Sequence, residues 1–134
     1  METAKELDWN EKLETGISEI DFQHKYFLEL IKKFIEIQKK HTLPEKIKPY
    51  LKELTLYARF HFYSEENYMN EINYPELDEH KLIHIQLIEE LSNIFTSFEM
   101  KHSKIDELTH FLISWFYDHT LKEDIKISNF IKGE

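Results

Sequence analysis

The sequence is most informative at residues 61–84, HFYSEENYMNEINYPELDEHKLIH. Two polar pairs stand four residues apart in this stretch, His61 with Glu65 and His80 with His84. Residues four apart lie on the same face of an α-helix, so each pair projects toward one point. The break at 73–75 is short, and short connections place successive helices antiparallel. The stretch therefore predicts a helical hairpin whose two helices direct imidazoles and a carboxylate toward one region.

Apolar residues at steps of three and four extend this pattern in both directions along the chain. One helix is predicted from about Ser18 to Lys40, and the next begins between Pro44 and Pro49. We predict an all-α fold, an antiparallel up-down-up-down four-helix bundle with an N-terminal arm to about Gly16 and a short C-terminal helix. The whole chain, residues 1–134, is expected to form a single domain.

Composition excludes several classes of function. The formal net charge of −9 repels nucleic acid and anionic membrane surfaces, so neither is expected as a partner. The lack of cysteine excludes disulfides, thiolate catalysis and iron–sulfur clusters. The N-terminus lacks the apolar run of a secretory signal, and no apolar stretch has membrane-spanning length, so a cytoplasmic protein is expected. A monomer is expected because no additional apolar face is apparent.

Polar residues interrupt the stripes that should form the core. The predicted inward positions are Ile20, His24, Phe27, Ile31 and Phe34, then Ile47, Leu51, Leu54, Ala58, His61, Glu65, Tyr68 and Ile72, then Leu77, His80, His84, Leu87, Leu91, Ile94 and Phe98, then Ile105, Leu108, Leu112, Trp115 and His119. A single buried histidine is usually structural, and burying imidazole or carboxylate without partners is costly. Here every helix contributes at least one, and all lie near the same end of an antiparallel bundle. This convergence predicts a metal site.

Asp124 is ambiguous from spacing alone. It follows His119 by five residues, so a regular α-helix would turn it about 140° away. It reaches the site only if the last helix carries a π-bulge or unwinds near Thr120–Leu121, as helices do at some functional sites. Otherwise it is a solvated surface charge. Glu66 is read as a surface charge, because it points to a different face from its neighbour Glu65.

Four segments together resemble the hemerythrin family, and the likeness extends over nearly the whole chain. They are Gly16–Lys25 with its Ile-Asp-Phe-Gln-His, His61–Met69, Tyr74–His84, and Trp115–Asp124. The resemblance implies two iron ions joined by an oxo or hydroxo bridge. His80, His84 and His119 would bind one iron, His24 and His61 would bind the other, and Glu65 and Asp124 would bridge them.

The resemblance also implies where O2 would bind. Two six-coordinate irons offer about twelve positions, and the histidines, bridging carboxylates and bridging oxygen leave one open, at the iron with fewer histidines. Apolar walls are expected from Phe27, Phe62, Trp115 and Phe116. Two positions depart from the family pattern. Phe116 replaces an aliphatic residue beside the O2 pocket, and Ile127 replaces a tyrosine that could support Asp124.

These observations predict a non-haem di-iron protein that binds O2 reversibly for storage, delivery or sensing, rather than an enzyme. An unidentified reductant or delivery partner is compatible with this function. Two alternatives stay open, a di-iron enzyme such as a nitric oxide reductase, peroxidase or oxidase, and a module regulated by O2 or iron. The His-x-x-x-Glu and His-x-x-x-His pairs differ from the Glu-rich sites of ferritin-like enzymes, which disfavours oxygenase chemistry. A metal-free structural bundle is the remaining possibility.

Overall fold

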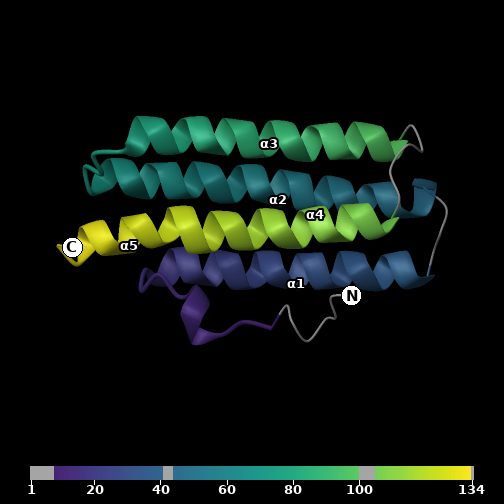
Figure 1. Ribbon diagram of the computed structural model, residues 1–134, viewed down its shortest axis with the longest axis horizontal. Coiled ribbons are helices and arrows are strands. Elements are labelled where there is room, and N and C mark those ends of the chain that lie inside the picture. The colour runs from purple at the N-terminus through teal and green to yellow at the C-terminus, as the bar shows by residue number, and fades with distance from the viewer. Residues whose placement is uncertain (1–7, 41–43, 100–104, 134) are drawn as a thin grey trace.

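Four long helices lie side by side in the computed structural model, which describes residues 8–40, 44–99 and 105–133 (Figure 1). They are α1 (Ser18–Lys40), α2 (Pro44–Glu71), α3 (Leu77–Glu99) and α4 (Ile105–Asp118). The direction of the chain reverses from each helix to the next in Figure 1, and no strand occurs in the described ranges. The predicted four-helix bundle is confirmed.

Helix α2 begins at Pro44, the earlier of the two prolines that bounded its predicted start. Pro44 occupies the first position of the helix, where its missing N–H would have had no partner in any case. Pro49 lies inside the helix and removes one backbone hydrogen bond near this end. Because the site residues of α2 lie at the opposite end, this irregularity does not reach them.

The apolar stripes meet in one large core that runs along the bundle axis. Buried side chains from all four helices form it, among them Phe27, Ile31, Phe34, Leu51, Leu54, Leu91, Leu108, Leu112 and Trp115. The predicted stripe was wrong at the end of α2, where Tyr68 and Ile72 are only half-buried and Met69 is fully buried. Met69 instead joins Tyr74 and Ile127 in a second small cluster. The last inward step along α2 is therefore four residues, from Glu65 to Met69, instead of three.

The N-terminal arm is fastened to the start of α1 by one carboxylate. Asp21 accepts hydrogen bonds from the backbone N–H of Thr15 at 2.8 Å, the Thr15 hydroxyl at 2.9 Å and the backbone N–H of Gly16 at 3.1 Å. Gly16 has φ +83°, a conformation that favours glycine. The arm packs on the bundle, with Leu13 buried and Trp9 half-buried against the core. These bonds fix the first turns of α1, where His24 lies.

The last helix does not stop at Asp118. A π-helical segment, η3 (His119–Asp124), joins α4 to the short helix α5 (Ile125–Ile131). Ile127 and Ser128 of α5 are buried, whereas Phe130 and Ile131 are exposed. The expected C-terminal helix is confirmed, and it continues the line of α4 beyond the end of the core.

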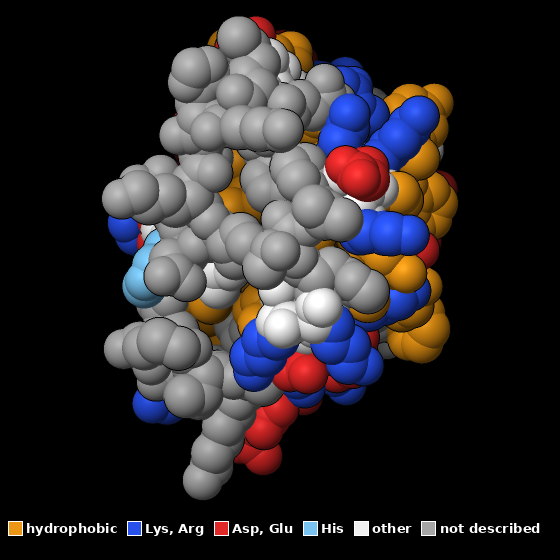
Figure 2. Space-filling model, turned by 90° about the vertical axis from the view of Figure 1, so that its right-hand side faces the viewer, with side chains coloured by type: hydrophobic (Ala, Val, Ile, Leu, Met, Phe, Trp, Pro, Cys, Tyr) orange, Lys and Arg blue, Asp and Glu red, His pale blue; other side chains and the backbone are white. Residues whose placement is uncertain are grey.

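The described surface mixes charged and apolar side chains. Figure 2 looks along the bundle and shows Lys and Arg among hydrophobic side chains at its right-hand edge. Five large apolar side chains are exposed on α1 and α2: Phe22, Tyr26, Leu56, Phe60 and Tyr63. The monomer was expected because no additional apolar face was apparent, and these exposed side chains weaken that argument. The monomeric state stays a prediction. Among the described helices, none combines the length and apolar character needed to cross a membrane.

Candidate metal centre

The structure brings all seven predicted site residues together in the interior of the bundle. Every helix contributes: His24 from α1, His61 and Glu65 from α2, His80 and His84 from α3, and His119 and Asp124 from the α4–η3 helix. None of the seven is more than 5% exposed. Their convergence follows from the antiparallel order, which puts the start of α1 and α3 beside the end of α2 and α4.

The seven side chains form two overlapping groups that share Glu65. The first group is Glu65, His80, His84 and His119, and the second is His24, His61, Glu65 and Asp124. Within each group the candidate ligand atoms all lie within 4.8 Å of one another. Nitrogen and carboxylate oxygen without thiolate suit iron or manganese, and also zinc or copper. The arrangement has the donor set and the spacing of a two-metal site.

Glu65 directs one carboxylate oxygen at each group. Its Oε1 lies 3.0 Å from Nε2 of His80 and 3.0 Å from Nε2 of His84. Its Oε2 lies 3.4 Å from Nε2 of His61, on the other side. The i, i+4 spacing of His61 and Glu65 on α2 places both side chains on one face, as the sequence predicted. A carboxylate held in this way can bridge two cations.

Asp124 spans the same two groups from the opposite direction. Its Oδ2 lies 2.7 Å from Nε2 of His24, and its Oδ1 lies 3.2 Å from Nε2 of His119 and 3.4 Å from Nε2 of His80. The side chain is fully buried, which excludes the alternative that Asp124 is a solvated surface charge. Two carboxylates therefore face both groups, each with one oxygen toward either side.

The π-helical turn explains how Asp124 reaches the site. In η3 the backbone hydrogen bonds span five residues instead of the four of an α-helix. This returns residue 124 to the face that carries His119. Of the possibilities that the spacing left open here, the structure has the π-bulge near Thr120–Leu121. The sequence carries a further signal for it, since a regular helix would turn Lys122 and Lys126 toward the core. Both lysines are exposed, and Ile127 is buried instead.

We call the seven residues of the two groups the cage. Two further residues outside the cage orient its imidazoles, and the sequence analysis missed both roles. Gln23 accepts a hydrogen bond from His61 through its Oε1, 2.7 Å from Nδ1. The Oε2 of Glu66 lies 2.7 Å from Nδ1 of His84. Hydrogen bonds of this kind fix the ring and leave Nε2 for a metal. Reading Glu66 as a surface charge was therefore incomplete.

Buried atoms without hydrogen bonds show that the cage fits metal ions. Nε2 of His24, His61 and His119 makes none with the described residues, and neither do Oε2 of Glu65 and both oxygens of Asp124. His24 and Asp124 approach closely, but their alignment is not that of a hydrogen bond. An unsatisfied buried polar group costs about 1–3 kcal/mol. All these atoms face one another, and metal ions between them would satisfy the whole set.

Comparison with known proteins agrees with this geometry. Residues 15–130 match the family model described as the hemerythrin HHE cation binding domain. Bacteriohemerythrin of Clostridium acetobutylicum is 33% identical over 122 residues, which is 87% of this chain and 94% of the relative. The chain belongs to the hemerythrin family. Bacteriohemerythrins of Campylobacter jejuni subsp. jejuni (34% identical, 90% of this chain and 92% of the relative) and Pseudomonas aeruginosa (33%, 88% and 76%) are similar to it along most of their length.

The aromatic residues predicted as pocket walls line this hemerythrin cage on one side. Phe27, Phe62, Trp115 and Phe116 are all buried. Phe116 lies edge-on to His24 at 6.0 Å between ring centroids and stacks on Phe27 at 5.7 Å. Its bulk therefore stands beside the group that has fewer histidines. The roles of these residues toward O2 stay predictions.

Ile127 leaves Asp124 without the support that a tyrosine would give. Its side chain is buried in the cluster with Met69 and Tyr74. The Tyr74 hydroxyl lies nearby in that cluster but donates to Glu76 instead, at 3.2 Å. Within the described residues Asp124 receives no hydrogen bond. Its position depends on the η3 backbone and on the imidazoles around it.

The buried carboxylates and imidazoles of the hemerythrin cage shift one another's pKa. Burial would raise the pKa of Glu65, but the imidazoles of His119, His61 and His80 hold it well below its usual range. Burial lowers the pKa of His61. Burial also opposes charge on His80, but Asp124 and Glu65 outweigh it and raise the pKa of His80 to about 10. Without metal, protons on imidazole balance the two buried carboxylates.

We expect metal uptake to release protons at pH 7.5. The His80 imidazole, with its pKa of about 10, is protonated there in the metal-free protein and must become neutral to bind metal. Its protonation stabilises the metal-free fold fully below the unfolded pKa of 6.5, and this contribution is lost as the pH rises through about 10. Apparent affinity should therefore rise about tenfold per pH unit for each proton displaced.

Proton release can be followed with an indicator dye while Fe(II) is added to weakly buffered protein under nitrogen. A variant of an exposed histidine on α4, His110→Gln, should release the same number of protons as the parent. Uptake without proton release at pH 7.5 would contradict the charge balance described for the cage.

Proposed function

We propose that this hemerythrin-family chain holds two iron ions and binds O2 reversibly at one of them. His80, His84 and His119 would hold one ion, His24 and His61 the other, and Glu65 and Asp124 would bridge the pair. When bound, the iron pair supplies the electrons and the binding position that O2 requires. An unidentified protein or small molecule would keep the pair reduced. Storage, delivery and sensing are all compatible with this chemistry.

One observation carries the proposal, the pair of ligand groups joined by two carboxylates. The first group offers three imidazoles and the second offers two, while Glu65 and Asp124 face both. Unequal groups leave the two metals with different coordination, and the ion held by fewer imidazoles has room for an added ligand. The likeness to bacteriohemerythrins over most of the chain supports iron as the metal and O2 as the ligand.

The residues around the cage have two tasks in this function. Gln23 and Glu66 hold the rings of His61 and His84 in place by hydrogen bonds to Nδ1. Phe27, Trp115 and Phe116 pack together beside the cage and exclude water from it. A dry, neutral pocket suits a small apolar ligand, and excluding water slows loss of bound O2 as a reactive species.

The test is optical. We expect anaerobically reduced, iron-loaded protein to develop a visible charge-transfer band when O2 is added, and to lose it when O2 is removed. Several cycles should restore the band with little loss of amplitude. Metal analysis should give two irons per chain.

Two results would contradict the proposal. Irreversible oxidation by O2 without a band would exclude reversible binding. Steady turnover of nitric oxide or peroxide with a reductant, at rates that exceed O2 exchange, would favour the enzymatic alternative. Phe116→Leu is an informative companion variant, because it removes the ring beside His24 while keeping an apolar wall.

A further inference from the structure

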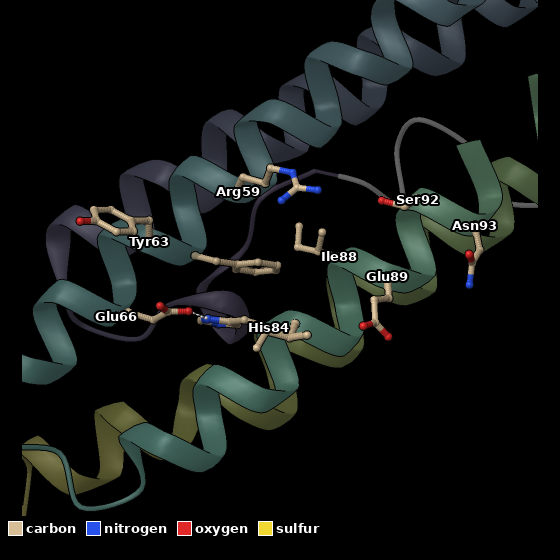
Figure 3. A pocket seen from close by; sticks show the side chains of 10 residues that line it. Arg59, Tyr63, Glu66, His84, Ile88, Glu89, Ser92 and Asn93 are labelled. Carbon is tan, nitrogen blue, oxygen red and sulfur yellow. Dashed lines mark hydrogen bonds and ion pairs between the residues drawn. The ribbon is translucent and has the colours of Figure 1, made fainter. Parts of the chain in front are cut away.

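An open groove lies between α2 and α3, outside the cage. Its volume is about 640 Å³, within the range of small-molecule sites. Phe62, Ile85 and Ile88 give it an apolar lining, and His84 forms part of its wall (Figure 3). Phe62, Glu66 and His84 belong both to this groove and to the surroundings of the metal centre, but the rest of the groove has no part in the proposed binding of O2.

His84 connects the groove to the metal centre. Its Nε2 lies 3.0 Å from Glu65 inside the cage, whereas its Nδ1 lies 2.7 Å from Glu66, which lines the groove. Its ring stacks on Phe62 with 4.1 Å between centroids and 8° between planes. The seven cage residues are buried, so a molecule as large as an aromatic ring does not reach the cage directly, although O2 is small enough to do so. A molecule in the groove touches the ring of one ligand and the aromatic ring stacked on it.

The polar groups of the groove favour a neutral ligand that both donates and accepts hydrogen bonds. Arg59 is exposed and makes no hydrogen bond or ion pair with the described residues, so its guanidinium is available as a donor. Glu66 uses one carboxylate oxygen for His84 and has the other available as an acceptor. A second carboxylate, Glu89, also lines the groove and disfavours an anion. Figure 3 shows Arg59 and Glu66 pointing into the groove from α2.

We propose that this groove binds a hydroquinone, which delivers electrons to the iron pair through His84. The ring would pack on Phe62 and Ile88, one hydroxyl would donate to Glu66, and the other oxygen would accept from Arg59. This proposal rests on the proposed function, because it supplies the reductant that function needs.

The electrons and protons of this reaction balance. Oxidation of one hydroquinone to a quinone breaks two O–H bonds and yields two electrons and two protons. The two electrons convert two ferric ions to ferrous ions. The two protons leave to solvent through the open side of the groove.

Binding is tested first, without electron transfer. Trimethylhydroquinone is titrated by calorimetry under nitrogen into iron-loaded protein that has already been reduced, and saturable binding is expected. Ile85→Trp fills the groove from its exposed rim and should weaken binding at least about tenfold. Leu82→Trp is the matched control, since Leu82 is equally apolar and exposed on α3 but does not line the groove. Arg59→Gln should weaken binding too, whereas Lys52→Gln should not.

Electron transfer is tested second, by mixing oxidised protein with trimethylhydroquinone under nitrogen. We expect the ferric absorption to disappear at a rate that saturates with hydroquinone, giving two ferrous ions per quinone formed. Ile85→Trp should slow this reduction at least about tenfold, while Leu82→Trp and reduction by dithionite stay unchanged.

The outcomes separate the two proposals. Equal binding and equal reduction rates for Ile85→Trp and Leu82→Trp would overturn the groove proposal, as would binding without reduction. Either result leaves reversible O2 binding unaffected. Protein that takes up no iron defeats the proposed function by metal analysis alone, before any hydroquinone is added.

Discussion

Glu65→Ala is expected to remove paired iron binding, with stoichiometry falling from two irons to fewer than one per chain. Glu65 is the residue that the two ligand groups share, and its two oxygens face His80 and His84 on one side and His61 on the other. Without Glu65, each ligand group loses one ligand. The site also loses one of the two negative charges that would offset the iron ions. Loss of an orienting residue outside the ligands already weakens metal binding about 10–100-fold, so loss of a shared ligand should exceed that range. Iron content and the O2-dependent band measure the effect.

A charge-matched control lies on the same helix. Glu71→Ala removes an exposed carboxylate from the end of α2 and should retain both irons. Glu65→Gln keeps the volume of the side chain but removes its charge, and it should fail in the same way as the alanine variant. Circular dichroism of each variant separates loss of metal from loss of the bundle. A folded Glu65→Ala variant with two irons would exclude Glu65 as a bridge.

Much of the cage was predictable because the ligands violate the pattern of the core. His24, His61 and Glu65 stand at positions where a helix of this period needs apolar side chains, and burial of such groups requires partners. The antiparallel order then fixed their common depth. The bounds of α1 match the predicted range of about Ser18 to Lys40, because its inward stripe keeps steps of four and three even where His24 replaces an apolar residue.

The outer residues of the site carry no such signal. Gln23 and Glu66 lie beside ligands at the edge of the buried face, where polar residues are ordinary on any amphipathic helix. Only the register between helices shows what they contact. Glu66 and His84 each stand nine residues from Pro75, so they lie at the same level of the α2–α3 hairpin. That register was available in the sequence, but the rotation of each helix was not.

The π-turn was predictable only as one of two alternatives. Spacing left Asp124 either on the surface or in the site, and local propensity did not separate them. Packing beyond the turn decides between them, because Ile127 is buried and Lys122 and Lys126 are exposed only if the helix phase shifts by one residue. The end of α2 illustrates the converse, where Met69 replaces Tyr68 in the core because α5 packs there.

Removing the metal is expected to destabilise the bundle by several kcal/mol. The cage contains buried nitrogen and oxygen atoms with no hydrogen bond, and two buried carboxylates that face each other. A ligand present at about a thousand times its dissociation constant stabilises the folded state by about 4 kcal/mol. Since about 1 kcal/mol shifts Tm by roughly 4 °C in a domain of this size, chelation should lower Tm by about 15 °C.

The comparison needs a variant in which chelation has nothing to remove. Glu65→Ala should show little further change in Tm on adding chelator, while the parent should recover its original Tm when Fe(II) is returned under nitrogen. The direction of the effect follows from the chemistry of the cage, since imidazolium can balance buried carboxylates but cannot satisfy every nitrogen that faces the interior. A parent protein whose Tm does not respond to chelation, although it had contained iron, would mean that packing of the four helices alone sets its stability. That result would contradict the expectation, because buried polar groups without partners should cost the metal-free fold about 1–3 kcal/mol each.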